Sequence, residues 1–528
     1  MLSFYKAFTE KTKNIICITS LLVFSILINQ YYGYQGVNPI DSFFSFNSGY
    51  DVLNGNFPFK DYWTITGPFI DFTLALIFKI FGVSWFSYVF YASCFNFIIT
   101  ILTFYTLKKF KLSIGYCFFY SFLVAILAYP SAGTPYVDHQ SAFLSIISVY
   151  FFILALNTKS KIYWLILPII LGISFLTKQA PTGHIILIIL FLSIVHFAFN
   201  FNWKKIIFSF VGSLIFVLVF LITLLICEIP ISSFFNQYIL FPISIGENRL
   251  EFLLPLEFTR VVLRFKLIHL SSLLLVIISV KKIMENYKYL KNNEFLTTLA
   301  LIGSSYALIA HQLMTINGMF IFFIIPILAG FSHIYYLKYF KNKNYISYLL
   351  ILLSFFSTVH YGNKYINKRD FMDLSKINME NAIDAKIFDK KFSGLKWITT
   401  LYPDNPKQEI SNLLEAIDII KKDSRNKVLV TDYQFISVLM SSYDFSPNKY
   451  WYKHHVYPGI DHKYFDIYRN FFINKLTKNQ IKVVYIIKPL WGDNNVLDTI
   501  LDKNCVKKAA LSNILDGYFL SCYRIPKN

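Results

Sequence analysis

Long apolar runs separated by short polar links fill the first 360 residues of the chain. The runs meet the usual length criterion for an α-helix that crosses about 30 Å of hydrocarbon. The pattern therefore predicts an α-helical polytopic membrane protein with about eleven transmembrane helices, at residues 15–34, 83–107, 112–129, 141–156, 162–176, 185–199, 206–226, 258–280, 296–314, 319–336 and 345–360.

One apolar segment, residues 66–82, is not expected to cross. Asp71 and Lys79 leave only residues 72–78 uninterrupted, and seven helical residues cover roughly 10 Å. We expect this segment to lie in the outer membrane interface as a juxtamembrane helix, with its charges toward the headgroups. It would then belong to one structured external loop that begins near residue 40.

Lysine clusters fix the predicted orientation. With a cytoplasmic N-terminus and no crossing by residues 66–82, the basic linkers 108–111, 159–161, 203–205, 281–291 and 338–343 all fall inside. Cytoplasmic loops carry such an excess of Lys and Arg. The count predicts a multi-pass protein of the cytoplasmic membrane whose C-terminal part is extracytoplasmic.

After residue 360 the chain becomes polar. Short apolar or alternating runs such as KVLVTDYQF and KVVYIIKPL, with helical patterns between them, predict a small α/β domain. We therefore expect two domains, a transmembrane domain at 1–360 and an extracytoplasmic domain at 361–528. Cys505 and Cys522 lie in this tail and could pair if it faces an oxidising compartment; the sequence leaves that pairing open.

Composition supports the membrane interpretation. Hydrophobic residues make up 55% of the chain and charged residues 15%, whereas soluble domains carry about 25% charged residues. The net charge of +20 suggests nucleic acid or anionic lipid as a partner. Because the basic residues sit in short clusters between apolar runs, we expect the lipid bilayer and no nucleic acid.

Three carboxylates gather in the first external loop: Asp41, Asp51 and Asp61. Asp51 and Asp61 lie in turn-rich sequence, where aspartate often only bonds the backbone. Asp41 opens a short amphipathic helix and could be its N-cap. Each of the three therefore has a structural interpretation beside a functional one.

Further polar residues occupy other external loops: Asp138, His139, Lys178, Gln179 and Arg249. Asp138 could cap the next span, His139 could be structural, and Lys178 could be a lysine snorkelling at a helix end. Lys178 nevertheless lies on the outer side, against the bias of the other lysines. That position favours an anionic partner.

Such a set suits one kind of chemistry. A carboxylate at the water–membrane boundary can act as general base on an acceptor, and nearby Lys and Arg can hold a phosphate leaving group. A second carboxylate could orient the acceptor or bind a divalent cation. This combination fits transfer of a group from a lipid-linked phosphate donor; a soluble nucleotide donor would be on the other side of the membrane.

The first external loop, DSFFSFNSGYDVLNGNFPFKDYWTITGPFIDFTLALIFKIFG, resembles that of bacterial GT-C glycosyltransferases of the protein mannosyltransferase-like class. In that class an early Asp opens a helix, followed by Leu-x-Gly-x-x-Pro-aromatic-basic-Asp and a Gly-Pro or Pro-Pro. Here Asp41 matches the early Asp, residues 53–61 match the central motif, and Gly67 with Pro68 match its end. The similarity extends through VDHQSAF and FLTKQAPTG.

The resemblance implies a GT-C-like fold with interfacial helices in this loop. It also implies a polyprenyl-phosphate sugar donor used on the outer face, generally with inversion. It assigns Asp41 as catalytic base and Asp138 as the second acidic residue. Many relatives carry an acidic pair at the first position, but Asp41 is followed by Ser42, so a divalent cation as cofactor stays open.

We therefore predict an integral-membrane glycosyltransferase of the bacterial cell envelope. It would transfer a sugar from a polyprenyl-phosphate donor to a glycan, glycolipid or protein acceptor. Asp41 and Asp138 are the expected catalytic residues, and the expected substrate-binding residues are Asp61, His139, Lys178, Gln179 and Arg249. The alternatives are a polysaccharide polymerase or ligase, and a lipid-linked glycan transporter or flippase, which would place ionisable residues mid-span and show halves of similar pattern.

Overall fold

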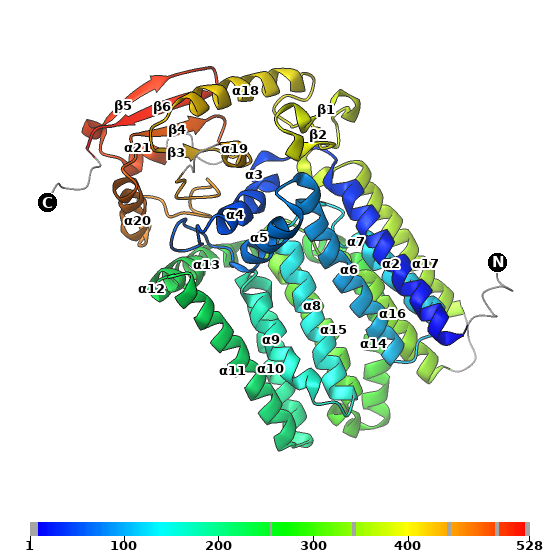
Figure 1. The fold of residues 1–528 in the computed structure, drawn as a ribbon. Helices are drawn as coiled ribbons and strands as arrows, with labels where there is room; N and C mark the ends of the chain where they lie inside the picture. The colour runs from blue at the N-terminus through cyan, green and yellow to red at the C-terminus, as the bar shows by residue number, and fades with distance from the viewer. Residues whose placement is uncertain (1–8, 254–255, 341–344, 441–444, 491–495, 523–528) are drawn as a thin grey trace. The chain divides into compact units, whose positions relative to one another are not determined.

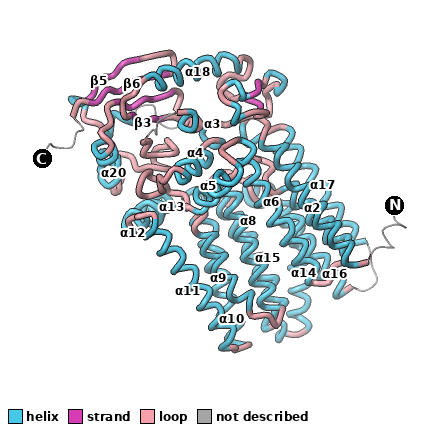
Figure 2. The backbone as a smooth tube through the Cα atoms, in the orientation of Figure 1, coloured by secondary structure: helices cyan, strands magenta, loops and turns pink. Residues whose placement is uncertain are grey.

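The computed structural model describes residues 9–253, 256–340, 345–440, 445–490 and 496–522. They form two compact units, each assembled from separate stretches of the chain. The helical unit comprises Met1–Gly33, Val89–Phe220 and Arg249–Phe371, and the mixed unit comprises Tyr34–Tyr88, Leu221–Asn248 and Met372–Asn528. Figure 2 shows that the strands belong to the mixed unit. The predicted domain boundary after residue 360 stays a prediction.

Helices that run alongside one another build the helical unit (Figure 1). Helix α8 packs on α9, α10 on α15, and α14 on α16. Helix α6 begins, and helix α11 ends, outside the bounds of this unit. The helices are α2 (Glu10–Gly33), α6 (Trp85–Lys109), α7 (Ile114–Leu127), α8 (Val137–Asn157), α9 (Ile162–Phe175), α10 (Gln179–Phe199), α11 (Trp203–Ile226), α14 (Lys266–Glu285), α15 (Asn293–Met314), α16 (Ile324–Tyr339) and α17 (Tyr345–Gly362).

Each predicted apolar run coincides with one of these helices. Within the described residues, eight helices are long and apolar enough to cross a membrane by length and composition: α2, α6, α8, α10, α11, α14, α15 and the stretch Tyr345–Met372 that contains α17. Helices α7 and α9 are apolar but shorter. The predicted fold class, a polytopic helical membrane protein with a small C-terminal α/β part, is confirmed, and crossing by all eleven helices stays a prediction.

The predicted basic linkers that follow α8, α10 and α14 lie at one end of the helical unit. Asn293, at the start of α15, donates from Nδ2 to the Leu156 carbonyl at the end of α8 (2.6 Å), and its Oδ1 lies 3.1 Å from His196 Nδ1 near the end of α10. Lys291 of the preceding linker lies over the Phe199 ring, 4.6 Å from its centre. These contacts define a basic end of the unit; the starts of α8 and α10 and the end of α15 lie about 30 Å away, at the opposite end.

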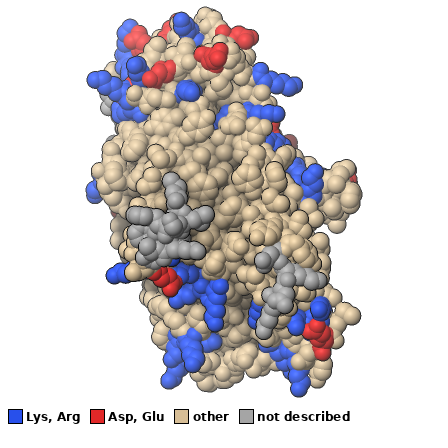
Figure 3. Space-filling view, turned by 90° about the vertical axis from the view of Figure 1, so that its right-hand side faces the viewer, with Lys and Arg blue, Asp and Glu red and all other residues tan. Residues whose placement is uncertain are grey.

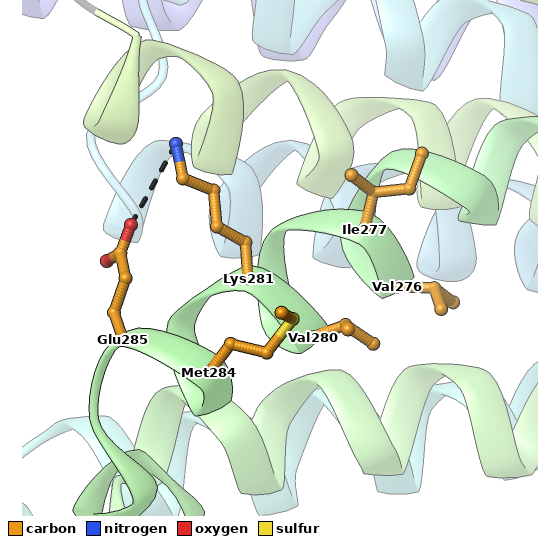
Figure 4. A pocket seen from close by; sticks show the side chains of 6 residues that line it. All are labelled: Val276, Ile277, Val280, Lys281, Met284 and Glu285. Carbon is orange, nitrogen blue, oxygen red and sulfur yellow. Dashed lines mark ion pairs between the residues drawn. The ribbon is translucent and has the colours of Figure 1, made fainter.

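Charge is sparse along the sides of the helices. Figure 3 shows one face on which Lys and Arg lie toward both the upper and the lower end, with a broad, largely uncharged region between them. A groove of about 570 Å³ runs along α14, lined by Val276, Ile277, Val280, Lys281, Met284 and Glu285 (Figure 4). Its only charged pair is Lys281 with Glu285, 3.8 Å apart. Apolar sides of this kind are what hydrocarbon contact requires.

The loop that the sequence predicts to be external folds into the short helices α3 (Pro39–Ser42), α4 (Phe44–Leu53) and α5 (Phe69–Phe81) of the mixed unit. Helix α5 packs closely on α4 and has 13 residues, a length of about 20 Å. Within the described residues, α5 is not one of the helices that are long and apolar enough to cross a membrane. The segment 221–248 adds α12 (Ile231–Phe234) and the start of α13 (Phe241–Leu253).

A four-stranded sheet of order β3-β4-β6-β5 organises the C-terminal part. Strands β3 (Lys427–Val430) and β4 (Val483–Ile487) are parallel, while β6 (Leu515–Leu520) is antiparallel to both β4 and β5 (Val506–Ala510). The connecting helices are α18 (Pro406–Lys422), α19 (Ile436–Leu439), α20 (Phe465–Lys478) and α21 (Val496–Ile500), and β1 (Ile383–Asp384) pairs with β2 (Lys396–Trp397).

Local sequence explains these elements. Asn405 accepts a hydrogen bond from the Gln408 amide and Pro406 follows it, a typical start for helix α18. All residues of β3 and β4 are buried, and apart from Lys427 at the start of β3 all of them are apolar, as is typical of strands covered on both faces. Cys505 and Cys522 flank the β5–β6 hairpin and form a disulfide. The sequence had left this pairing open.

Candidate functional site

Asp138, Lys178 and His311 meet at the end of the helical unit opposite the basic end. Lys178 Nζ lies 2.7 Å from Asp138 Oδ1, and His311 Nε2 lies 2.9 Å from the same oxygen. The side chains of Asp138 and His311 are each 4% exposed and that of Lys178 is 18% exposed. We call these three residues the Asp138 cluster; it places one carboxylate between two nitrogen donors with only the lysine partly open to solvent.

Three helix ends build this cluster. Asp138 is in the first turn of α8, His311 is in the last turn of α15, and Lys178 is the N-cap residue of α10. A carboxylate near a helix N-terminus and a histidine near a C-terminus both suit the helix dipole. The ends of these helices thus bring together residues that are far apart in the sequence.

Cations dominate the surroundings of Lys178. Its burial lowers the pKa of the ammonium, the carboxylate of Asp138 opposes that effect, and Arg249 lowers the pKa further. Arg249 lies in α13 and is half-buried. Lys178 is therefore held by one carboxylate and feels the charge of a second cation, and an anion that bound near it would interact favourably with both cations.

His139 and Gln179 have different surroundings. His139 is fully buried, its Nε2 lies 3.0 Å from Ser131 Oγ, and the ring of Phe320 packs on it with centroids 4.8 Å apart. These are the contacts of a structural histidine, so a substrate contact of His139 stays a prediction. Gln179 follows Lys178 at the start of α10 and is half-buried.

Asp41 belongs to the mixed unit, where it lies in α3 and is half-buried. The hydroxyl of Tyr450 donates a hydrogen bond to its Oδ1 at 2.9 Å. Because Asp138 belongs to the helical unit, convergence of these two carboxylates on one substrate stays a prediction. The predicted N-cap role of Asp41 is not observed: it is the third residue of α3, whose N-cap is Asn38.

The other loop carboxylates are paired with the C-terminal part of the chain. Asp61 accepts from the Phe57 amide (2.9 Å) and from Lys475 Nζ (2.7 Å). Asp51 forms an ion pair with Lys449, and both side chains are 1% exposed. The turn-forming interpretation of Asp61 is therefore supported by its contacts, and its contact with substrate stays a prediction.

Four residues that contact the predicted site residues or Asp51 were not predicted from the sequence: His311, Lys449, Tyr450 and Lys475. His311 lies within a predicted span, where only the polar pair His311–Gln312 near the span's end could have drawn attention. The three tail residues had no distinguishing signal, because their partners lie some 400 positions earlier.

A metal site finds little support in the described part of the chain. Within it, no group of three or more His, Cys, Asp or Glu side chains is arranged to hold a metal ion. Ser42, next to Asp41, also lacks the carboxylate that completes the acidic pair of many relatives. The residues do not fit the metal that the resemblance left open.

No protein-family model and no curated protein sequence matches this chain. The fold is similar to that of solved structures, which include two crystal structures of ArnT from Cupriavidus metallidurans. The structure bound to undecaprenyl phosphate covers 98% of this chain and 100% of its own, with 11% identity and a TM-score of 0.47. The apo structure covers 97% and 98%, with 11% identity and a TM-score of 0.48.

Proposed function

We propose that this protein is an integral-membrane glycosyltransferase of the GT-C type. It would transfer one sugar from a polyprenyl-phosphate donor to a glycan, glycolipid or protein acceptor on the extracytoplasmic face of the cytoplasmic membrane. The proposal rests on the sequence motif around Asp41 and on the Asp138 cluster.

The observation that carries the proposal is the position of Lys178. Its ammonium is held by Asp138 at 2.7 Å at the end of the helices opposite the basic linkers, and Arg249 acts on it electrostatically. The positive-inside rule leaves that end outside. A partly exposed cation supported by a second one suits the phosphate of a lipid whose chain lies in the bilayer.

The proposed reaction needs one base and one anion site. Asp41 takes the proton from an acceptor hydroxyl or amine, whose oxygen or nitrogen attacks the anomeric carbon of the sugar. The bond between that carbon and the phosphate oxygen breaks, and the electron pair leaves with the polyprenyl phosphate. Lys178 and Arg249 stabilise the charge that develops on that oxygen. Attack opposite the leaving group inverts the anomeric centre.

The experiment uses membranes that contain the protein and a radiolabelled polyprenyl-phosphate sugar. Covalent transfer of label from the donor into an envelope fraction is the expected result. Asp41→Asn should abolish this transfer while the protein remains in the membrane. Asp466→Asn is the matched control, because Asp466 is exposed in α20 of the same unit, and it should transfer as wild type does.

Two outcomes contradict the proposal in different ways. Retained turnover by Asp41→Asn removes the assignment of the base. Movement of labelled donor across the membrane without any covalent product would instead identify a transporter.

A further inference from the structure

Three of the four aspartates in the predicted first external loop have a partner in the tail. Asp41 accepts a hydrogen bond from Tyr450, Asp51 pairs with Lys449, and Asp61 pairs with Lys475. Lys449 and Tyr450 are consecutive residues. The tail thus contacts the proposed base and, through the neighbouring side chain, the helix that follows it.

The Asp51–Lys449 pair is deeply buried. Each side chain is 1% exposed. An unpaired charge buried to this degree is strongly destabilising, so separating either side chain from its partner is unfavourable. Asp51 is in helix α4, which begins three residues after Asp41. The pair therefore fixes the backbone of residue 449 relative to α4, and residue 450 with it.

Trp63 fixes the same tail segment from both sides. Its backbone amide donates to the Pro447 carbonyl at 2.7 Å, and its indole Nε1 donates to the Val456 carbonyl at 3.0 Å. Trp63 is 1% exposed and belongs to the core of the mixed unit. Residues 447 and 456 are thereby attached to the first external loop at two points that enclose Tyr450.

Tyr450 itself is oriented by its ring. The ring meets that of Phe44 edge to face, with centroids 5.5 Å apart, a favourable aromatic arrangement. Its hydroxyl then reaches Asp41 Oδ1 at 2.9 Å. A tyrosine has only two side-chain torsions, so a ring held in this way leaves the hydroxyl little freedom.

We propose that Tyr450 is a positioning residue for Asp41, and that the Asp51–Lys449 pair holds Tyr450 in place. The inference rests on the proposed function, since it assigns a partner to the proposed base. A neutral donor to a carboxylate stabilises the ionised form. Tyr450 would stabilise the ionised form of Asp41 and hold its carboxylate in one orientation, which makes the C-terminal part of the chain a component of the active site.

The test is the pH dependence of transfer by the full-length protein. Tyr450→Phe removes the hydroxyl and keeps the ring. The acidic limb of its rate profile should move to higher pH by about one unit, which lowers the rate on that limb up to about tenfold. The plateau rate at higher pH and the KM for the donor should stay within about twofold of wild type.

Tyr452→Phe is the matched control. Tyr452 lies two residues further along the same segment and stacks on His455, with ring centroids 4.5 Å apart. Its profile should coincide with that of wild type. Lys449→Met, compared at a temperature at which circular dichroism shows it folded, should move the acidic limb in the same direction as Tyr450→Phe; an unmoved limb would remove the role of the Asp51–Lys449 pair.

The outcomes separate this inference from the proposed function. If Asp41→Asn is inactive but the acidic limb of Tyr450→Phe coincides with that of wild type, Tyr450 has no positioning role and the proposed function stands. If wild type transfers no sugar, or Asp41→Asn transfers normally, the base assignment and this inference are both wrong.

Discussion

Replacing Asp71 by Asn should stabilise the mixed unit at neutral pH. Asp71 is 2% exposed in α5 and accepts hydrogen bonds from Ser48 Oγ (2.6 Å) and Tyr62 OH (2.8 Å). Burial raises the pKa of its carboxyl from 3.8 to about 6, against the opposing effect of these two hydrogen bonds. An ionised Asp71 is therefore unfavourable in the folded protein.

The sign and size follow from linkage. A carboxyl with a raised pKa binds its proton more tightly in the folded state than in the unfolded state. Its stabilising contribution to the free energy of unfolding is therefore fully present below about pH 4 and is lost as the pH rises through 6. At about 1.4 kcal/mol per pKa unit, the difference between 3.8 and about 6 amounts to about 3 kcal/mol. Asn cannot ionise; one hydroxyl can keep donating to its side-chain oxygen while the other turns to accept from its NH2 group.

The assay is thermal unfolding in detergent at pH 4.5 to 7.5, followed by tryptophan fluorescence. Trp63 and Trp451 are buried in the core of the mixed unit and report on it. The Tm of Asp71→Asn minus that of wild type should rise with pH, reaching about 6 to 12 °C at pH 7.5 for about 3 kcal/mol in a unit of this size. Taking the difference in Tm between variant and wild type at each pH removes the contributions of the other titrating groups, which both proteins share.

Asp423→Asn is the control of opposite sign. Burial alone would raise the pKa of Asp423, but hydrogen bonds from Arg425 and Tyr485 outweigh it and lower the pKa to about 2. That variant should be less stable than wild type by a constant amount from pH 4.5 to 7.5. For Asp71→Asn, a difference that does not change with pH, or a loss of stability at pH 7.5, would refute the reasoning.

Three further predictions concern buried groups. Lys449→Met should destabilise the mixed unit by about 3–5 kcal/mol because it leaves Asp51 buried and unpaired; the double variant with Asp51→Leu should recover most of the lost Tm, and an unrecovered double variant would contradict this account. His311→Leu should weaken binding of undecaprenyl phosphate about tenfold by releasing Asp138 from one donor, with His311→Gln closer to wild type in the same titration. Glu409→Leu should lower the Tm markedly and Glu409→Gln only slightly, since Glu409 accepts three buried hydrogen bonds.

The sequence by itself determined which segments form the helices of the helical unit. Hydrocarbon requires long apolar runs with internally satisfied backbone groups, so the runs 141–156 and 185–199 marked α8 and α10 and their C-terminal ends, although these helices begin at Val137 and Gln179. Asp71 and Lys79 likewise marked α5 as a short helix outside the set of spans. Counting basic linkers then placed Asp138 and Lys178 at the same end of the helices, and the structure joins them at 2.7 Å.

Only the tertiary structure decided which partners the polar residues take. A carboxylate in a turn has the same local pattern whether it bonds its own backbone or a distant lysine, so Asp51 and Asp61 gave no sign of Lys449 and Lys475. His311 was concealed within an apolar run, because its neighbours satisfy the pattern of a span regardless of what its ring contacts. Periodicity records which face of an element is apolar; the packing of distant elements selects the partner of a buried charge.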